Sequence, residues 1–394
     1  MRLFVLVLSL VITQGVFSAP DESALGKNDN YPTCRPGTGY RPHCLVGTFS
    51  RYDELVPAKK VAAAPKAREL KRVPEPKELG VDAYLAENRN TGLLILRGDT
   101  ILAERYQYDR GPQHRFTSMS MAKTVVAMLM GIAVAEKKIV SIDDLAEKYV
   151  PELKGQPFGE TSLRHLLTMS SGVTVGRRPD GGDDSGPLYR KTVLQQGPGG
   201  ADTVSGYMAR GNPAGTRFFY SSNETQVLGL VLRAATGRGL ADYCAEKLWQ
   251  PMGAEADATW VVDRGGYETG YVGINATLRD WGRFGLLLAH QGERDGRQII
   301  PAEWVRAATT VTAPHLAPGT ATKNNGYGYQ TWLIDREGRF AALGAYGQAV
   351  MVDPRTKVVM VHTAVHAGPR DGAARAPQFK YFFSTLNTLA SLTP

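Results

Sequence analysis

The sequence feature that most constrains the fold is the stretch 116–136, FTSMSMAKTVVAMLMGIAVAE, which is apolar nearly all round from Val125 to Val134. A segment of this kind is accommodated as a helix buried in a core, since no face of it suits water. Thr117 and Ser118 are good N-cap residues, so the helix is expected to begin close to them. The chain has 394 residues and 43% hydrophobic content. That is enough to surround such a helix with one large core.

Ser120 and Lys123 stand three residues apart at the expected start of this helix. Residues at this spacing share a helix face, so the lysine amine can reach the serine hydroxyl. Lysine acts as a base near neutral pH only where burial or a neighbouring cation lowers its pKa from about 10.4. The apolar helix supplies desolvation, and its positive end favours charge on an oxyanion. The spacing alone also fits a capped helix with a surface lysine, so its meaning depends on the rest of the chain.

A second motif lies in the stretch 215–230, GTRFFYSSNETQVLGL. Tyr220, Ser221 and Ser222 precede a run that reads as a helix with Val227 and Leu228 on its apolar face. A phenol in this place can relay a proton between a serine and a leaving group. The alternative is a buried tyrosine whose hydroxyl is satisfied by a neighbour.

Both ends of the sequence are rich in strand patterns. Two apolar runs around Gly98-Asp99 predict a hairpin near the start of the globular part. Four further strands are expected at 327–334, 339–343, 348–352 and 358–365, followed by a helix at 378–392. Strands at both ends with helices between them indicate an α+β fold, in which one antiparallel sheet is built from both chain ends and a helical domain is inserted.

A third motif, Gly344-Ala345-Tyr346-Gly347-Gln348, lies on one of the C-terminal strands. With Ser120-x-x-Lys123 and Tyr220-x-Ser222, it resembles the motifs of the serine β-lactamase and penicillin-binding protein superfamily. Within it the sequence is most similar to class C β-lactamase-related hydrolases, including the esterase and 6-aminohexanoate-dimer hydrolase branch. The resemblance covers roughly 80–392 and implies a β-lactamase-like fold.

The resemblance also implies roles for individual residues. Ser120 would be the nucleophile, and Lys123 and Tyr220 the proton-transfer groups. The amides of Ser120 and Gln348 would form the oxyanion hole. The substrate-binding residues would be Ser222, Tyr346, Gly347 and, from the glycine-rich loop 174–215, Tyr189.

Two positions depart from the family pattern. Ser222 stands where class C β-lactamases carry asparagine, and Ala345 stands where relatives carry lysine or histidine. That cation helps to bind a substrate carboxylate, so its absence favours an uncharged ester or amide. The sequence therefore predicts a serine hydrolase that cleaves a small-molecule ester or amide through an acyl-Ser120 intermediate, without a cofactor. The alternatives are a D-Ala-D-Ala carboxypeptidase or β-lactamase, and a catalytically inactive binding protein of the same fold.

Other ligand classes find little support. His362 and His366 are four residues apart in HTAVH, which lacks the glutamate of a zinc-protease helix, so they are interpreted as core or edge histidines and no metal site is expected. The net charge of +8 is dispersed along the chain and no nucleic-acid motif is present, so no nucleic-acid partner is expected. Nothing in the sequence indicates an oligomeric state.

The N-terminal region sets the expected compartment. Residues 1–19 read as a signal peptide cut near Ala19, so the protein is expected to be exported to the periplasm or secreted. No later apolar run is long enough to insert stably in a membrane. Residues 20–79 read as an irregular extension and Pro/Lys-rich linker, wrapped on the surface or partly disordered, and 80–394 as the hydrolase domain. Cys34 and Cys44 could form a disulfide, whereas Cys244 is expected to be a buried apolar residue.

Overall fold

The structure is a computed structural model that describes residues 19–35, 37, 40–176, 185–369 and 372–392. The predicted signal peptide, 1–19, lies outside the described residues except for Ala19.

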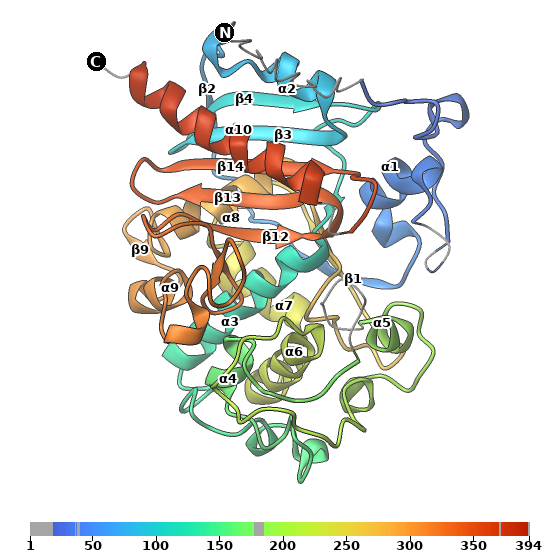
Figure 1. Cartoon of the computed structure of the whole chain (residues 1–394), viewed down its shortest axis with the longest axis vertical. Helices are drawn as coiled ribbons and strands as arrows, with labels where there is room; N and C mark the ends of the chain where they lie inside the picture. Colours follow the sequence, from blue (N-terminus) through green and yellow to red (C-terminus); the bar gives the residue numbers. More distant parts are fainter. Residues whose placement is uncertain (1–18, 36, 38–39, 177–184, 370–371, 393–394) are drawn as a thin grey trace, which may run out of the picture.

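A mixed eight-stranded sheet forms the upper half of the molecule in Figure 1. Its strand order is β10-β11-β12-β13-β14-β3-β4-β2, and every neighbouring pair is antiparallel except the short parallel pair of β2 and β4. The strands are β2 (Lys71–Arg72), β3 (Asn90–Arg97), β4 (Thr100–Tyr106), β10 (Gly326–Tyr327), β11 (Trp332–Leu333), β12 (Phe340–Gly344), β13 (Gln348–Asp353) and β14 (Val358–Ala364). The hairpin of β3 and β4 turns at Gly98 and Asp99, as predicted. Because β3 pairs with β14, the sheet joins the two ends of the chain, which confirms the predicted fold.

Helices cover both faces of this sheet. On one face α10 (Gly372–Ser391) and α2 (Val81–Glu87) pack on the side chains of Leu93 and Ile95. On the other face α8 (Leu278–Ala289) packs on Leu94 and Leu96. Alternate residues of β3 therefore point to opposite cores, as the two-residue period of a strand requires. Figure 1 shows α10 crossing in front of the sheet and α8 behind it.

The inserted helical part lies below the sheet in Figure 1 and surrounds the predicted apolar helix. This helix is α3 (Ala122–Ala135), all of whose residues up to Ala133 are buried. It packs against α6 (Ser222–Thr236), and Trp304 closes over its middle at Gly131. The remaining helices of this part are α4 (Leu163–Leu167), α5 (Gly186–Thr192), α7 (Leu240–Cys244) and α9 (Ala302–Ala308). Cys244 is buried at the end of α7, as expected.

A second, four-stranded sheet connects the helical part to the N-terminal region. Its order is β1-β6-β7-β5, formed by β1 (Ala58–Val61), β5 (Phe116–Thr117), β6 (Ala258–Val261) and β7 (Ile274–Ala276). Strand β5 ends directly before the turn that carries Ser120, so its pairing with β7 fixes where that turn begins. A separate two-stranded hairpin is formed by β8 (Glu293–Arg294) and β9 (Arg297–Gln298).

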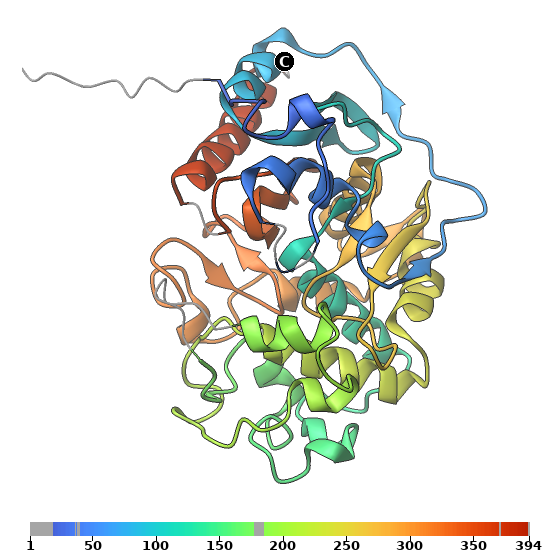
Figure 2. The ribbon, with the colours of Figure 1, turned by 90° about the vertical axis from the view of Figure 1, so that its right-hand side faces the viewer.

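The N-terminal region is more ordered than the sequence predicted. We refer to residues 20–56 as the N-terminal arm. Within it α1 (Pro42–Ser50) is a helix buried from Cys44 to Ser50, where an irregular segment was expected. The helix was missed because its apolar residues are few and are flanked by prolines and glycines, so local sequence gave little sign that tertiary packing would bury it. In Figure 2 the arm (dark blue) lies on the side facing the viewer, above α5 (light green).

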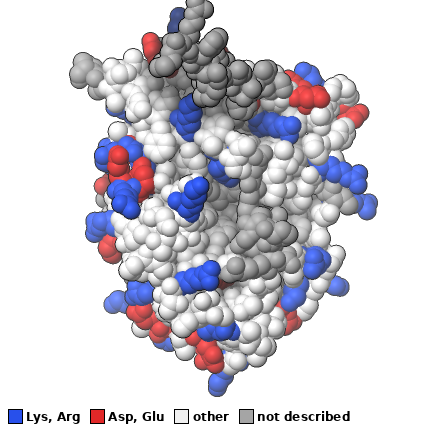
Figure 3. Space-filling view, viewed as in Figure 1, with Lys and Arg blue, Asp and Glu red and all other residues white. Residues whose placement is uncertain are grey.

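Charged side chains do not gather into a single patch on the face of the molecule shown in Figure 3. On the face shown in Figure 3, lysines and arginines are scattered among acidic and uncharged residues. None of the helices in the described part of the chain is both long and apolar enough to span a membrane.

Candidate active site

Ser120 lies in a tight turn between β5 and α3. The turn is a short 3-10 helix, η4 (Met119–Met121), so the serine precedes the α-helix instead of lying in its first turn. Met119 has a left-handed backbone with φ of 44°, a strained conformation for a residue with a side chain. Ser118 fixes the turn, since its amide donates to the Ile274 carbonyl at 2.7 Å and its Oγ accepts from the Ile274 amide at 3.1 Å. Ser120 remains partly exposed at the N-terminus of α3.

Lys123 is brought to Ser120 as the spacing predicted. Its Nζ donates to Ser120 Oγ at 3.0 Å and to the Tyr271 carbonyl at 3.1 Å. The side chain is buried, with 1% of its surface exposed. Its Nζ also lies 5.1 Å from the ring centre of Tyr220 and 5.4 Å from that of Tyr271. Two aromatic rings and the serine therefore surround the amine.

Tyr220 is held beside Lys123 by the residues before and after it. The amide of Phe219 donates to the Met169 carbonyl at 2.8 Å, and α6 begins at Ser222. The Tyr220 ring stacks on Trp332 with ring centres 5.2 Å apart. Ser222 is 5% exposed and lines the same cavity as Ser120 and Tyr220, whereas Asn223 is fully buried and is not among the residues that line it.

The end of β12 forms the wall opposite Tyr220. Gly344, Ala345 and Tyr346 line the cavity. Gly344 passes so close to the turn that carries Ser120 that a Cβ added to it would lie 2.4 Å from the carbonyl oxygen of Ser118. Only glycine lets the strand approach the turn to this extent.

Two predicted residues lie behind this wall. Gln348 is 1% exposed, begins β13 and donates from Nε2 to the Ala364 carbonyl at 2.6 Å, so its side chain ties two strands together. Gly347 has φ of 96°, and its carbonyl accepts from Gln378 Nε2 at 3.1 Å. Neither residue is among those that line the cavity. The GAYGQ motif therefore reaches the cavity through its first three residues.

The cavity has a volume of about 950 Å³, and ten of its 28 lining residues are aromatic. Tyr189 lines it from α5 as predicted, and Tyr346 from the turn after β12. Residues that sequence reasoning did not assign also line it: Tyr40, Tyr52, Arg217, Tyr271, Trp332 and Arg375. Tyr271 alone had a local signal, since it precedes the Gly273-Ile274-Asn275 pattern that positions the nucleophile turn.

The charge in this cavity is positive. Arg375 reaches it from α10 and donates to the Gly344 carbonyl at 2.6 Å and to Gln378 Oε1 at 3.0 Å. Burial lowers the pKa of Arg375 to about 10, which leaves the guanidinium charged at neutral pH. Arg217, which precedes Phe218 in the sequence, also lines the cavity. Among the described lining residues there is no aspartate or glutamate.

His362 and His366 do not approach this cavity as a metal site. His362 is buried in β14, with Nδ1 2.8 Å from the Gly347 carbonyl and Nε2 3.0 Å from the Tyr84 hydroxyl. No group of three or more potential metal-ligating side chains occurs in the described part of the chain.

A serine at the start of a buried helix, an adjacent lysine, a tyrosine from the helical part and a facing strand define a serine hydrolase of the β-lactamase fold. The family model described as beta-lactamase matches residues 81–379. The chain belongs to this family.

Individual relatives agree with this membership. The 6-aminohexanoate-dimer hydrolase of Paenarthrobacter ureafaciens is 27% identical over 331 residues, which span 79% of this chain and 83% of the relative. Among solved structures, a Bacillus anthracis protein assigned as a 6-aminohexanoate-dimer hydrolase superposes with a TM-score of 0.81 at 23% identity, covering 96% of this chain and 100% of that one. EstCE1, a hydrolase with promiscuous acyltransferase activity, superposes with a TM-score of 0.58 at 16% identity, covering 76% and 96% of the two chains.

Proposed function

We propose that the protein hydrolyses a small-molecule ester or amide through an acyl-Ser120 intermediate. The observation that carries the proposal is the 3.0 Å contact between Lys123 Nζ and Ser120 Oγ at the edge of a substrate-sized cavity. Lys123 is buried beside the serine, and in the proposed mechanism its amine acts as the base toward the serine hydroxyl. The name of the Paenarthrobacter relative, which denotes the hydrolysis of an amide dimer, supports this substrate class.

In this mechanism Lys123 accepts the hydroxyl proton while Ser120 Oγ forms a bond to the substrate carbonyl carbon. The carbonyl electron pair moves onto the oxygen, and its return breaks the bond to the leaving group. Tyr220, beside Lys123, passes a proton to that group. Water then attacks the acyl-serine and loses its proton to the same pair, which releases the acid and restores the serine hydroxyl.

The oxyanion needs two amide donors at the strand side of Ser120. We assign one to the Ser120 amide, as the sequence predicted. For the second we propose the Ala345 amide in place of Gln348, because Ala345 lines the cavity directly after Gly344, whereas Gln348 lies behind the wall.

A second function is favoured by Arg375. The sequence favoured a substrate without a carboxylate, because Ala345 stands where relatives carry a cation. Arg375 supplies positive charge from α10 to the same end of β12, where its guanidinium hydrogen-bonds the Gly344 carbonyl. A substrate carboxylate could pair with it, which keeps a β-lactamase or D-Ala-D-Ala carboxypeptidase as the second candidate.

Intact-mass spectrometry tests these proposals. The purified protein is exposed separately to a short-chain nitrophenyl ester, a fluorophosphonate and a penicillin, with Ser120→Ala as the control. We expect a fluorophosphonate adduct and ester turnover that both vanish in the variant. A stable penicillin adduct on the protein, or hydrolysis of the penicillin, would establish the second candidate if it vanishes in Ser120→Ala. If no reagent gives an adduct or turnover, Ser120 is not an accessible nucleophile, and the remaining alternative is a binding protein of the same fold.

We further propose that the protein is exported. The disulfide between Cys34 and Cys44 supports this, since such bonds persist in oxidising compartments. Determining the N-terminal residue of the protein isolated from its native cells tests the proposal: a start near residue 20 is expected, and a retained Met1 contradicts it.

A further inference from the structure

Two tyrosines of the N-terminal arm line the substrate cavity. Tyr52 is buried just after α1, and Tyr40 is partly exposed just before it. Neither belongs to the nucleophile turn, the proton-transfer group or the facing strand, so the proposed mechanism leaves both without a role.

The hydroxyls of both arm tyrosines meet the hydroxyl of Tyr189. Tyr40 donates to the Tyr189 oxygen at 3.1 Å, and the oxygens of Tyr52 and Tyr189 lie 2.9 Å apart. Two hydrogen bonds use two of the three hydroxyl protons. The hydroxyls of Tyr40 and Tyr52 also hydrogen-bond to each other, so the third proton has a phenol oxygen beside it, and a ligand oxygen that enters the cavity can take that proton in place of the phenol oxygen. Burial raises the pKa of all three phenols, so they stay protonated donors.

The arm also contacts the strand wall of the cavity. The ring of Tyr40 stacks on Tyr346, with ring centres 5.4 Å apart and planes at 11°. Tyr346 is presented by a left-handed backbone with φ of 61°, and Phe49 of α1 packs edge-on against it at 5.1 Å. The arm therefore bridges α5, which carries Tyr189, and the turn after β12, which carries Tyr346.

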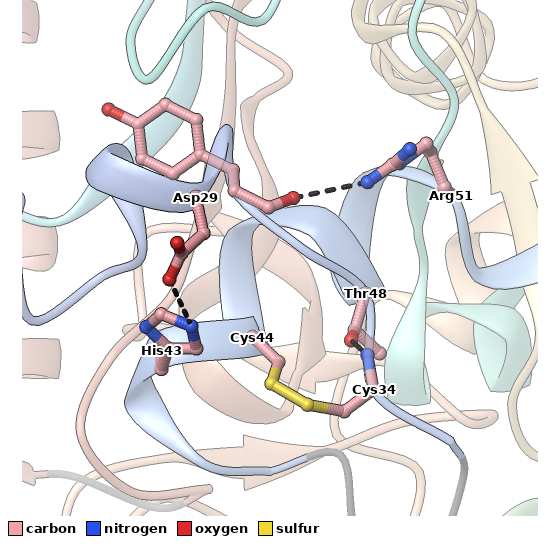
Figure 4. Close-up of a disulfide and its surroundings, with 7 residues drawn as sticks. Asp29, Cys34, His43, Cys44, Thr48 and Arg51 are labelled. Carbon is pink, nitrogen blue, oxygen red and sulfur yellow. Dashed lines mark hydrogen bonds and ion pairs between the residues drawn. A yellow bond between two sulfur atoms is a disulfide. The ribbon is translucent and has the colours of Figure 1, made fainter.

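Several bonds hold the arm in this place. Figure 4 shows the disulfide of Cys34 and Cys44, the bond from the Cys34 amide to Thr48 Oγ1 at 3.1 Å, and the contact of Asp29 with His43 at 3.1 Å. Arg51, the residue before Tyr52, donates to the Tyr31 carbonyl at 3.1 Å. Side chains fixed in this way lose little freedom when a ligand binds.

We propose that Tyr40 and Tyr52 are specificity-determining residues: with Tyr189 they form a hydrogen-bond-donor subsite for an oxygen acceptor of the substrate that is remote from the scissile bond. The acceptor that fits is a carbonyl or carboxylate oxygen, because it accepts a hydroxyl proton from the three phenols and, unlike an alcohol, brings no proton of its own that needs a partner. This inference rests on the proposed hydrolase function. The arm residues act by positioning the subsite and take no part in the bond-making steps.

The test compares kcat/KM for matched nitrophenyl esters. One series has plain alkyl acyl chains; the others carry an amide or a carboxylate at increasing distance from the scissile carbonyl, on the acyl side or in the leaving group. The Tyr40→Phe/Tyr52→Phe double variant keeps the rings and removes the hydroxyls. We expect the ratio of kcat/KM for the best acceptor-bearing ester to kcat/KM for the alkyl ester of equal length to fall about threefold to tenfold, mainly through KM of the acceptor-bearing ester. Tyr189→Phe should show the same selectivity.

Tyr243→Phe is the matched control, since its hydroxyl bonds Glu136 outside the cavity. It should change neither ester class. An equal loss for both classes in the double variant, or no loss for any acceptor-bearing ester, overturns the subsite. If the wild-type protein neither turns over any ester nor forms a Ser120 adduct with a fluorophosphonate, the proposed hydrolase function fails instead, so the two failures are distinguishable.

Discussion

Replacing Gly344 with alanine probes how closely the facing strand must approach the nucleophile. The backbone of Gly344 has φ of −123° and ψ of 157°, which any residue adopts, so the substitution adds no backbone strain. The added Cβ would lie 2.4 Å from the Ser118 carbonyl oxygen and 3.0 Å from the Met119 Cβ. Ordinary contact begins at 3.4 Å, so strand and turn must separate by about 1 Å. A displacement of ~1 Å at a reacting centre lowers the rate by about 10²-fold.

We therefore expect kcat for a nitrophenyl ester to fall by about 10²-fold in Gly344→Ala, and overpacking to lower the free energy of unfolding by about 1–3 kcal/mol. Steady-state kinetics and urea unfolding measure the two effects separately. Gly338→Ala is the matched control, because Gly338 has φ of 92° with open space around it, far along the same strand hairpin. It should lose stability and keep its kcat. A Gly344→Ala protein that keeps wild-type kcat would refute the argument from close approach.

Three further predictions follow from the same structure. Lys123→Met should lower kcat/KM by about 10²–10⁴-fold through loss of the base. Lys148→Met, which removes a surface ion pair with Asp144, should leave kcat/KM unchanged. Equal activities of the two variants would exclude Lys123 from the mechanism. Replacing Cys34 and Cys44 with serine opens a loop with a sequence separation of 10 and should lower the free energy of unfolding by roughly 3 kcal/mol in a thermal or urea unfolding assay, and an unchanged midpoint would contradict this. Burial lowers the pKa of both His362 and His366 to about 3, below the ordinary value for histidine. Between about pH 6.5 and pH 3 the unfolded chain therefore binds more protons than the folded protein. The free energy of unfolding should fall on acidification through this window by up to ~1.4 kcal/mol per pH unit for each histidine. Urea midpoints of the wild type and of His362→Gln/His366→Gln between pH 7 and pH 5 should diverge in slope, and parallel slopes would count against the buried neutral imidazoles.

The contact between Ser120 and Lys123 was predictable from sequence because it depends on local spacing. Ser120 and Lys123 meet through one helical turn, and the apolar pattern that follows them identified the buried helix. Tyr220 required the family pattern, since only tertiary packing against Trp332 brings it to Lys123. The sheet from both chain ends was predictable because each of its longer strands has a clear apolar run.

The rest of the site depends on contacts that no local pattern encodes. Tyr40 and Tyr52 belong to a segment whose composition indicates a surface extension, yet they reach Tyr189 across the cavity. Arg375 comes from a helix that begins earlier than its apolar residues suggest, with Pro377 inside it. The burial of Gln348 depends on the pairing of β13 with β14, because its side-chain amide donates to the Ala364 carbonyl at the end of β14.

The pairing of β3 with β14 determines when a newly made chain can become active. It joins residues 90–97 to residues 358–364, so the loop between the two strands contains the nucleophile turn and the whole helical part. Closing a loop of this length costs conformational entropy and makes sheet formation slow. A nascent chain that has emerged only as far as α9 already holds Ser120, Lys123 and Tyr220, but it lacks β12 and the cavity wall that β12 forms. Activity should therefore appear late in synthesis, after the last strands dock, and until then the unpaired edge of β3 is open to chaperones or to aggregation.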